Sequence, residues 1–175
     1  MCVLFIMSYS LKNENNEPAE LIEYSYRNPK QVRIIEACLK GWFSNPKDLN
    51  LTDPRMSYPF NIKKWMALSY ENENTHAYFL KKNDWIVGMI SLRHEPEQNK
   101  AHIFHVFVDR VFRSRGYGRR LTDLAEAKAL EMGVKQLRLF VLPKNKIAES
   151  LYRKRGFKEM GISRNGSLSM IKDLN

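Results

Sequence analysis

Residues 113–118 of this chain read RSRGYG, and this segment says most about the chain because of the patterns on either side of it. It follows an apolar strand pattern, Ile103 to Val108, and precedes a helical pattern that opens at Arg119. A basic loop between a strand and a helix N-terminus binds anions, because unpaired backbone N–H groups and the helix dipole both point at the ligand. Gly116 and Gly118 lack a Cβ, so the backbone can approach that ligand closely. The sequence therefore predicts a site for a phosphate-bearing cofactor.

The spacing within this loop excludes two common phosphate-binding motifs. A dinucleotide fingerprint, G-x-G-x-x-G, needs a glycine at position 121, which is Leu121. A Walker loop ends in G-K-[S/T], whereas this chain continues Gly118-Arg119-Arg120. The pattern R-x-x-G-x-G after a strand instead resembles the acetyl-CoA loop of the GNAT N-acetyltransferases. Taken alone, the loop is also compatible with an ordinary glycine-rich turn.

A second segment carries the same resemblance, one helix and one strand later. Residues 145–157, from Asn145 to Phe157, match the family's N-x-x-A-x-x-L-Y-x-x-x-G-F pattern at every specified position. An amphipathic helix with Gly156 as its left-handed cap would explain the apolar residues. It would not explain Asn145 or the joint occurrence with the loop. From the two segments together the chain is identified as a member of the GNAT family.

The composition fits one globular domain. With 175 residues, 43% of them hydrophobic and 11% aromatic, the chain can bury a full core. The formal net charge of +10 favours anionic partners such as CoA phosphates, nucleic acid or an acidic protein surface, or simply a solvated basic surface. Two cysteines, Cys2 and Cys38, form neither a metal motif nor a disulfide framework, which fits a cytoplasmic protein.

The N-terminal region is expected to lie outside the domain. We expect residues 1–20 to form a mobile segment and residues 21–175 to form a single GNAT acetyltransferase domain. Residues 1–7 are apolar but too short to cross a bilayer, and they lack the features of a signal peptide, so we expect no membrane anchor. Met7 is an alternative start of the chain.

The segments around the motifs follow the order β-α-α-β-β-β-α-β-α-β-β. Asn28 and Pro29 open the first helix, with Gln31 as the returning partner of a capping box, and residues 45–58 form a connection without a regular pattern. This order resembles the complete GNAT fold, which implies an α/β (α+β) class with a mixed central sheet of about seven strands flanked by about four helices. The predicted strands are residues 21–27, 75–82, 85–92, 101–108, 135–142, 157–163 and 168–172.

The resemblance implies transfer of an acetyl group from acetyl-CoA, the cosubstrate, to a primary amine. Main-chain groups at the end of the strand would bind the pantetheine arm, the loop would hold the pyrophosphate, and Asn145 would bond the arm or its neighbouring backbone. Tyr152 is the predicted proton donor to the departing thiolate, since a phenol is protonated at neutral pH. Without the flanking motif it would be a core aromatic residue. The cofactor-binding residues implied are Val106, Phe107, Val108, Arg113, Ser114, Arg115, Gly116, Tyr117, Gly118, Arg119 and Asn145.

The general base is not evident in the sequence. Bacterial enzymes that acetylate ribosomal-protein N-termini carry a glutamate within L-E-V-R-x-x-N, and Phe140 stands at that position here. His105, on the strand that enters the site, is one candidate, with a structural strand residue as the alternative. We expect that the amine loses its proton to ordered water or arrives already neutral. No cluster has the spacing of metal ligands, so we expect no metal.

Two other functional classes stay open beside acetyl transfer. The charge could serve a basic nucleic-acid-binding domain, although no RRM, KH or helix-turn-helix signature accompanies it. The chain could also be a catalytically silent CoA-binding module, which the presence of Tyr152 argues against. The amine, on a small molecule or a protein, is not specified by any motif. We expect its pocket between the first helices and the terminal hairpin, and a homodimer is left open.

Overall fold

The computed structural model describes residues 19–174, which contain a seven-stranded mixed sheet in the order β1-β2-β3-β4-β5-β7-β6. The predicted mobile segment and the alternative start at Met7 thus fall largely or wholly outside the described residues. The strands are β1 (Glu20–Tyr24), β2 (Thr75–Lys82), β3 (Trp85–Glu95), β4 (Lys100–Val108), β5 (Gln136–Val141), β6 (Lys158–Ile162) and β7 (Leu168–Asp173). The helices are α1 (Pro29–Trp42), α2 (Pro46–Thr52), α3 (Ile62–Ser69), α4 (Tyr117–Glu131) and α5 (Lys146–Lys154), with single 3-10 turns η1 (Pro96–Gln98) and η2 (Arg110–Phe112).

The sheet opens between its two parallel strands. β4 and β5 are paired only from Lys100↔Gln136 to Ile103↔Leu139, although both strands continue beyond these pairs. The cause is a bulge in β4. Met89 of β3 pairs with Phe107 of β4, and Ser91 pairs with Phe104, so two residues along β3 correspond to three residues along β4. The extra residue leaves the ladder and bends the strand. Beyond Ile103, β4 therefore turns away from β5.

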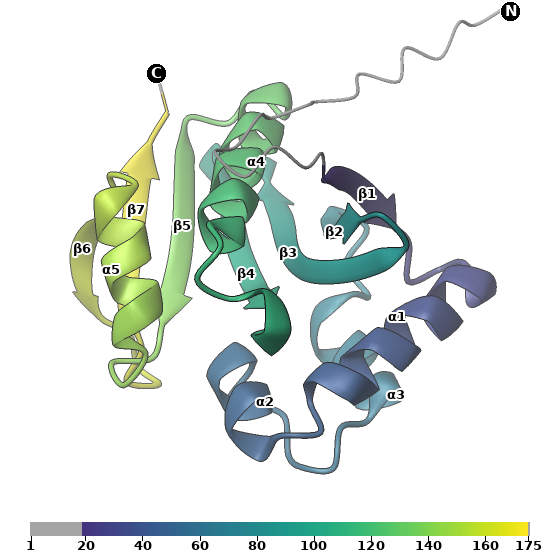
Figure 1. Ribbon diagram of the computed structural model, residues 1–175. Coiled ribbons are helices and arrows are strands. Elements are labelled where there is room, and N and C mark those ends of the chain that lie inside the picture. The colour runs from purple at the N-terminus through teal and green to yellow at the C-terminus, as the bar shows by residue number, and fades with distance from the viewer. Residues whose placement is uncertain (1–18, 175) are drawn as a thin grey trace, which may run out of the picture.

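Helices cover both faces of the sheet (Figure 1). α4 lies over β3 and β4 and α5 lies over the β5–β7–β6 side, and Leu121 and Ala125 of α4 are fully buried in the core on this face. α1, α2 and α3 gather at the lower right, where Leu39 and Trp65 are fully buried in a second core. The sheet separates the two cores, as expected for a strand set whose inward residues alternate between faces.

The predicted fold class is confirmed, with one helix more than expected. The additional helix is α2, which lies in the segment predicted to be irregular. Its N-cap is Asn45, whose side chain accepts from the N–H groups of Lys47 and Asp48. Asn28 caps α1 in the same way. The Asn45-Pro46 pair thus repeats the signal that identified the first helix, but seven residues are too few for a visible apolar period.

Two details of the predicted local structure are wrong. Gln31 does not return to its own cap, because its Oε1 accepts from the N–H of Ser25 at 2.8 Å. The helix after the basic loop begins at Tyr117 rather than Arg119, so Gly118 belongs to its first turn. Smaller differences affect strand ends: β3 continues to Glu95, beyond its predicted end at residue 92, and β1 ends at Tyr24, before its predicted end at residue 27.

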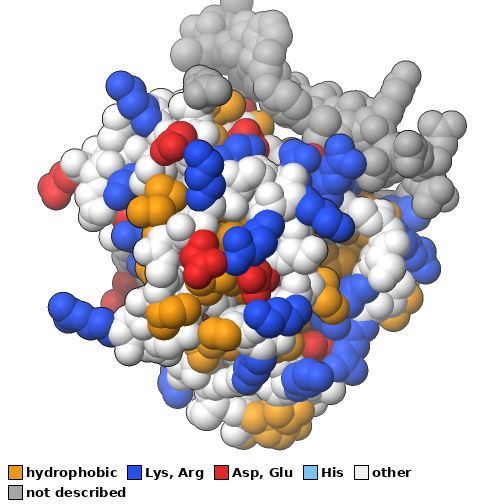
Figure 2. Space-filling view, turned by 90° about the vertical axis from the view of Figure 1, so that its left-hand side faces the viewer, with side chains coloured by type: hydrophobic (Ala, Val, Ile, Leu, Met, Phe, Trp, Pro, Cys, Tyr) orange, Lys and Arg blue, Asp and Glu red, His pale blue; other side chains and the backbone are white. Residues whose placement is uncertain are grey.

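The basic residues do not gather in one place on the face that includes α5. Figure 2 shows this face with Lys and Arg side chains interspersed with acidic, apolar and uncharged ones. Within the described residues, no helix is long and apolar enough to cross a bilayer.

A substitution at Gly88 tests how closely β3 packs against the end of β4. A Cβ at this position would lie 2.8 Å from the backbone O of Phe107 and 3.2 Å from a methyl of Leu121. Because backbone cannot yield, we expect Gly88→Ala to lower the free energy of unfolding by about 1–3 kcal/mol, measured by urea titration. In the control Gly41→Ala the new Cβ meets nothing within 4 Å, so stability should stay equal or rise by up to about 1 kcal/mol. Equal effects of the two substitutions would contradict this account.

Candidate active site

A cleft of about 390 Å³ lies where β4 and β5 separate. Its walls come from α2, the end of β4, the basic loop with the start of α4, and α5. All the predicted site residues line it except Arg115 and Arg119. The residues brought together are Val106, Phe107, Val108, Arg113, Ser114, Gly116, Tyr117, Gly118, Asn145 and Tyr152.

The start of α4 forms the anion-binding wall of the cleft. Gly116, the N-cap, has a φ of 81° and offers no side chain to the helix. The first helical hydrogen bond runs from Arg120 N to Gly116 O, so the N–H groups of residues 117–119 have no acceptor within the helix. Together with the helix dipole they favour an anion at this point. The sequence predicted such a helix start after the basic loop. In the structure the helix begins at Tyr117, two residues before the predicted start at Arg119.

The two arginines outside the cleft have other contacts. Arg119 is 69% exposed, and its Nε lies 3.8 Å from Asp123, one turn further along α4. The guanidinium of Arg115 lies over the ring of Phe112, 5.6 Å from its centroid. Because α4 begins at Tyr117, Arg119 is the third residue of the helix. Its side chain lies on the outer surface, and only its backbone N–H lies at the helix start.

Arg113 joins the loop to α2 through a residue that the sequence analysis missed. Its Nη2 lies 3.3 Å from Oδ2 of Asp48, a buried carboxylate that also accepts from Arg110 Nε at 2.6 Å. Arg113 Nε donates to the backbone O of Val108 at 2.9 Å, and its guanidinium covers the ring of Phe107. Asp48 thus holds α2 against the loop while it balances part of the loop's positive charge.

The opposite wall is the N-terminal half of α5. Asn145 caps this helix by accepting from the N–H of Ala148 at 3.3 Å. Tyr152 is buried, with its ring against Phe157, and burial raises the pKa of its phenol. Among the described residues, no group forms a hydrogen bond with the Tyr152 hydroxyl. The cleft therefore contains a protonated phenol with no hydrogen-bond partner from residues 19–174.

A second cavity, of about 250 Å³, adjoins the cleft, and we call it the acceptor-side cavity. Leu51 and Thr52, at the end of α2, line both spaces. The acceptor-side cavity is bounded by residues 51–55, by β3 and β4, by the end of β5 and by the turn between β6 and β7. These are the segments from which the amine pocket was predicted, the early helices and the terminal hairpin.

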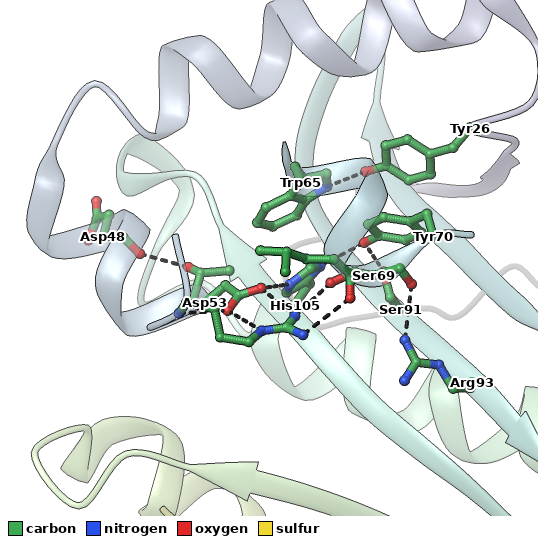
Figure 3. A network of polar contacts seen from close by, with 12 residues as sticks. Tyr26, Asp48, Asp53, Trp65, Ser69, Tyr70, Ser91, Arg93 and His105 are labelled. Carbon is green, nitrogen blue, oxygen red and sulfur yellow. Dashed lines mark hydrogen bonds and ion pairs between the residues drawn. The ribbon is translucent and has the colours of Figure 1, made fainter. Parts of the chain in front are cut away.

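His105 lies at the bulge, in the floor of this cavity (Figure 3). It has a φ of 50°, its Nε2 lies 2.8 Å from Asp53 Oδ2, and its Nδ1 lies 2.8 Å from the hydroxyl of Tyr70. Trp65 stacks on the imidazole at 3.7 Å between centroids. Burial lowers the pKa of His105, against the opposing effect of Asp53, so the ring is neutral at physiological pH. With both nitrogens engaged, His105 has the contacts of a structural residue.

Asp53 is the second acidic residue that the sequence analysis missed. Burial opposes its ionisation, but hydrogen bonds from His105 and Arg55 outweigh burial and hold the pKa of Asp53 well below its usual range. Arg55 binds it through two contacts, Nε to Oδ1 at 2.9 Å and Nη2 to Oδ2 at 2.7 Å. Asp53 is therefore ionised and paired with Arg55, and it anchors the segment after α2 to the bulge.

Phe140 also lines the acceptor-side cavity. Its ring meets His102 edge-on, with 5.4 Å between centroids. Burial, followed by the positive charges of Arg138 and Arg93, lowers the pKa of His102 to about 3. In this part of the cavity His102 is thus neutral, and the charged groups that act on it most strongly are the guanidinium groups of Arg138 and Arg93. Within the described residues, no group of three or more His, Cys, Asp or Glu side chains could hold a metal ion.

Residues 39–157 match the family model of the acetyltransferase (GNAT) family. The chain belongs to the GNAT acetyltransferase family. The resemblance found in the sequence is thereby confirmed, and with it the cosubstrate, since GNAT acetyltransferases use acetyl-CoA.

Solved GNAT structures share the fold at low sequence identity. The GNAT domain of S. lividans PAT has a TM-score of 0.77 at 12% identity, over 91% of this chain and 93% of that one. The PaiA N-acetyltransferase of Thermoplasma acidophilum, in complex with coenzyme A, has a TM-score of 0.65 at 19% identity, over 89% and 99%.

One curated relative matches by sequence over a shorter stretch. A mycothiol acetyltransferase of Jonesia denitrificans is 36% identical over 75 residues, which are 43% of this chain and 24% of that protein. The match thus spans about a quarter of the relative's length.

The low pKa of His102 has a consequence for stability. In the unfolded chain His102 is protonated below its usual pKa of 6.5. In the native state it stays neutral down to about pH 3. The unfolded state then binds more protons, so the free energy of unfolding falls as the pH falls, by at most about 1.4 kcal/mol per pH unit for this one group. We expect His102→Gln to flatten the fall between pH 6 and pH 4, measured by urea titration at each pH. Parallel curves for the two proteins would refute the assignment.

Proposed function

We propose that this chain transfers the acetyl group of acetyl-CoA to the primary amine of a small molecule or a protein. The observation that carries the proposal is the position of Tyr152, a protonated phenol without a hydrogen-bond partner among residues 19–174, in a cleft that has an anion-binding helix start on one side. Family membership supports the use of acetyl-CoA. The family match and the structural relatives give no support to a nucleic-acid-binding domain.

The end of β4 suits the pantetheine arm. β4 is paired with β3 as far as Val108, but with β5 only as far as Ile103. The backbone groups of residues 106–108 on the β5 side therefore have no strand partner within the described sheet. An extended amide-containing chain can pair with such an edge as an added strand. The pyrophosphate would then reach the N–H groups at the start of α4.

The proposed reaction is direct attack of the amine on the thioester. The neutral nitrogen forms a bond to the carbonyl carbon, the C–S bond breaks, and the electron pair leaves on sulfur. Tyr152 gives its proton to that sulfur, so CoA departs as a thiol. The proton that the amine loses passes to water, because both nitrogens of His105 are already engaged with Tyr70 and Asp53. Phe140, near the acceptor, cannot accept a proton.

Replacement of Tyr152 by Phe tests the proton donor. The variant lacks one hydroxyl and keeps the ring that packs on Phe157. We expect kcat to fall by about 10²-fold or more, with acetyl-CoA affinity within about threefold of wild type. The measurement is release of the CoA thiol with a good amine, beside calorimetric titration of CoA. Wild-type turnover in the variant would make Tyr152 a structural residue.

Gly118→Asp tests the cofactor site. The new Cβ meets only a methyl of Leu151 at 3.4 Å, so the fold can accept it, but the carboxylate would stand at the anion-binding start of α4. We expect CoA affinity to fall by about 100-fold or more in calorimetry, because a like charge opposes the phosphates. Gly41→Asp adds the same charge where nothing lies within 4 Å, and it should bind CoA as wild type does. A folded Gly118→Asp variant with unchanged affinity would remove the basis of the proposal.

A further inference from the structure

The charges that line the acceptor-side cavity do not cancel. Among the described residues that line it, the one carboxylate is Asp53, which Figure 3 labels, and Arg55 binds this group through two contacts. His102 and His105 are neutral, since both have a lowered pKa. The cation that remains is Arg93, which comes from β3 and lines the same cavity.

Arg93 has no acidic partner among the described residues. Its Nε donates to Thr75 Oγ1 at 3.3 Å and its Nη2 donates to the backbone O of Ser69 at 3.1 Å. Its guanidinium also lies over the ring of Phe104, 5.2 Å from the centroid. These neutral contacts fix the orientation of the guanidinium but leave its charge and the Nη1 donors uncompensated. A planar group held in this way is prepared to bind an oxyanion.

The charge of Arg93 acts on its neighbours in the cavity. His102 faces Arg93 across the β3–β4 ladder, and the positive charge of Arg93 is one of the causes that lower the pKa of His102. The same charge acts on any cation that enters. A diamine or polyamine would bring its second ammonium group toward Arg93, and like charges in a partly buried space repel each other strongly.

We propose that the acceptor is a primary amine that also carries an anionic oxygen group, a carboxylate or a phosphate, and that Arg93 binds this group. The inference rests on the proposed function and specifies its substrate class. The anionic end would lie at Arg93, with Phe104 and Phe140 beside the intervening chain, and the amine would lie toward Leu51 and Thr52, where the cavity adjoins the cleft.

The test compares matched amines in the thiol-release assay at saturating acetyl-CoA. The central set is β-alanine, phosphoethanolamine, β-alaninamide and 1,3-diaminopropane, which share a two- or three-carbon spacing and differ in charge. The same comparison of acid with amide extends to longer ω-amino acids and to the standard amino acids. We expect the best anionic amine to exceed its neutral counterpart in kcat/KM by about tenfold or more, with the diamine lowest. The carboxylate and phosphate arms show which oxyanion is used.

Variants assign the preference to Arg93. Arg93→Gln should lower kcat/KM for the anionic amine by about tenfold or more and bring the ratio of acid to amide toward one, whereas Arg93→Lys should keep part of the ratio. The control is Arg27→Gln, just after β1, because Arg27 is paired with Glu73 at 3.3 Å and does not line the cavity. It should keep the ratio within about threefold.

The outcomes separate this inference from the proposed function. The inference is overturned if the wild-type protein acetylates amides or diamines at least as fast as anionic amines. That result leaves acetyl transfer standing, and it needs no variant. A ratio that survives in folded Arg93→Gln also overturns it. Absence of thiol release with every amine, by a protein that binds CoA, overturns the proposed function together with the inference.

Discussion

One additional residue in β4, relative to β3, opens the sheet. The bulge at His105 ends the pairing of β4 with β5 after Ile103, and both cavities lie at the resulting gap. A residue with a φ of 50° is costly for a side chain that has a Cβ, so the surroundings must hold it there. His105 is held by Asp53, by Tyr70 and by the stacked ring of Trp65. These contacts therefore hold the shape of the strand at the bulge.

The short helix α2 connects the two cavities. At its start, Asp48 binds Arg110 and Arg113 of the loop, and just beyond its end Asp53 binds His105 at the bulge. The carboxylates are 6% and 3% exposed, so neither can lose its partners without leaving a buried charge. These ion pairs are therefore constraints on position more than sources of net stability.

The sequence was most informative where function constrains a contiguous segment. The loop and the α5 segment could be read because each carries its motif within 13 residues or fewer, and nearly all of their predicted residues meet in one cleft. The roles assigned to those residues remain predictions. Asp48 and Asp53 escaped notice because their partners lie 62 and 52 residues away, in contacts that no local pattern encodes. The side chain of Arg119 lies outside the cleft, but its backbone N–H is one of the three free N–H groups at the start of α4, so its predicted contact with the pyrophosphate through the backbone stays a prediction.

The shared wall formed by Leu51 and Thr52 has a thermodynamic meaning. In the proposed reaction α2 would contact both ligands, and a segment that does so couples their binding equilibria, because any shift of α2 that one ligand favours changes the space that the other meets. Linkage makes such heterotropic coupling reciprocal. If bound acetyl-CoA changes the affinity for the acceptor by some factor, the bound acceptor changes the affinity for acetyl-CoA by the same factor. Since α2 is fixed at both ends by ionic contacts, it would transmit that coupling as a nearly rigid body, with few internal degrees of freedom to absorb it.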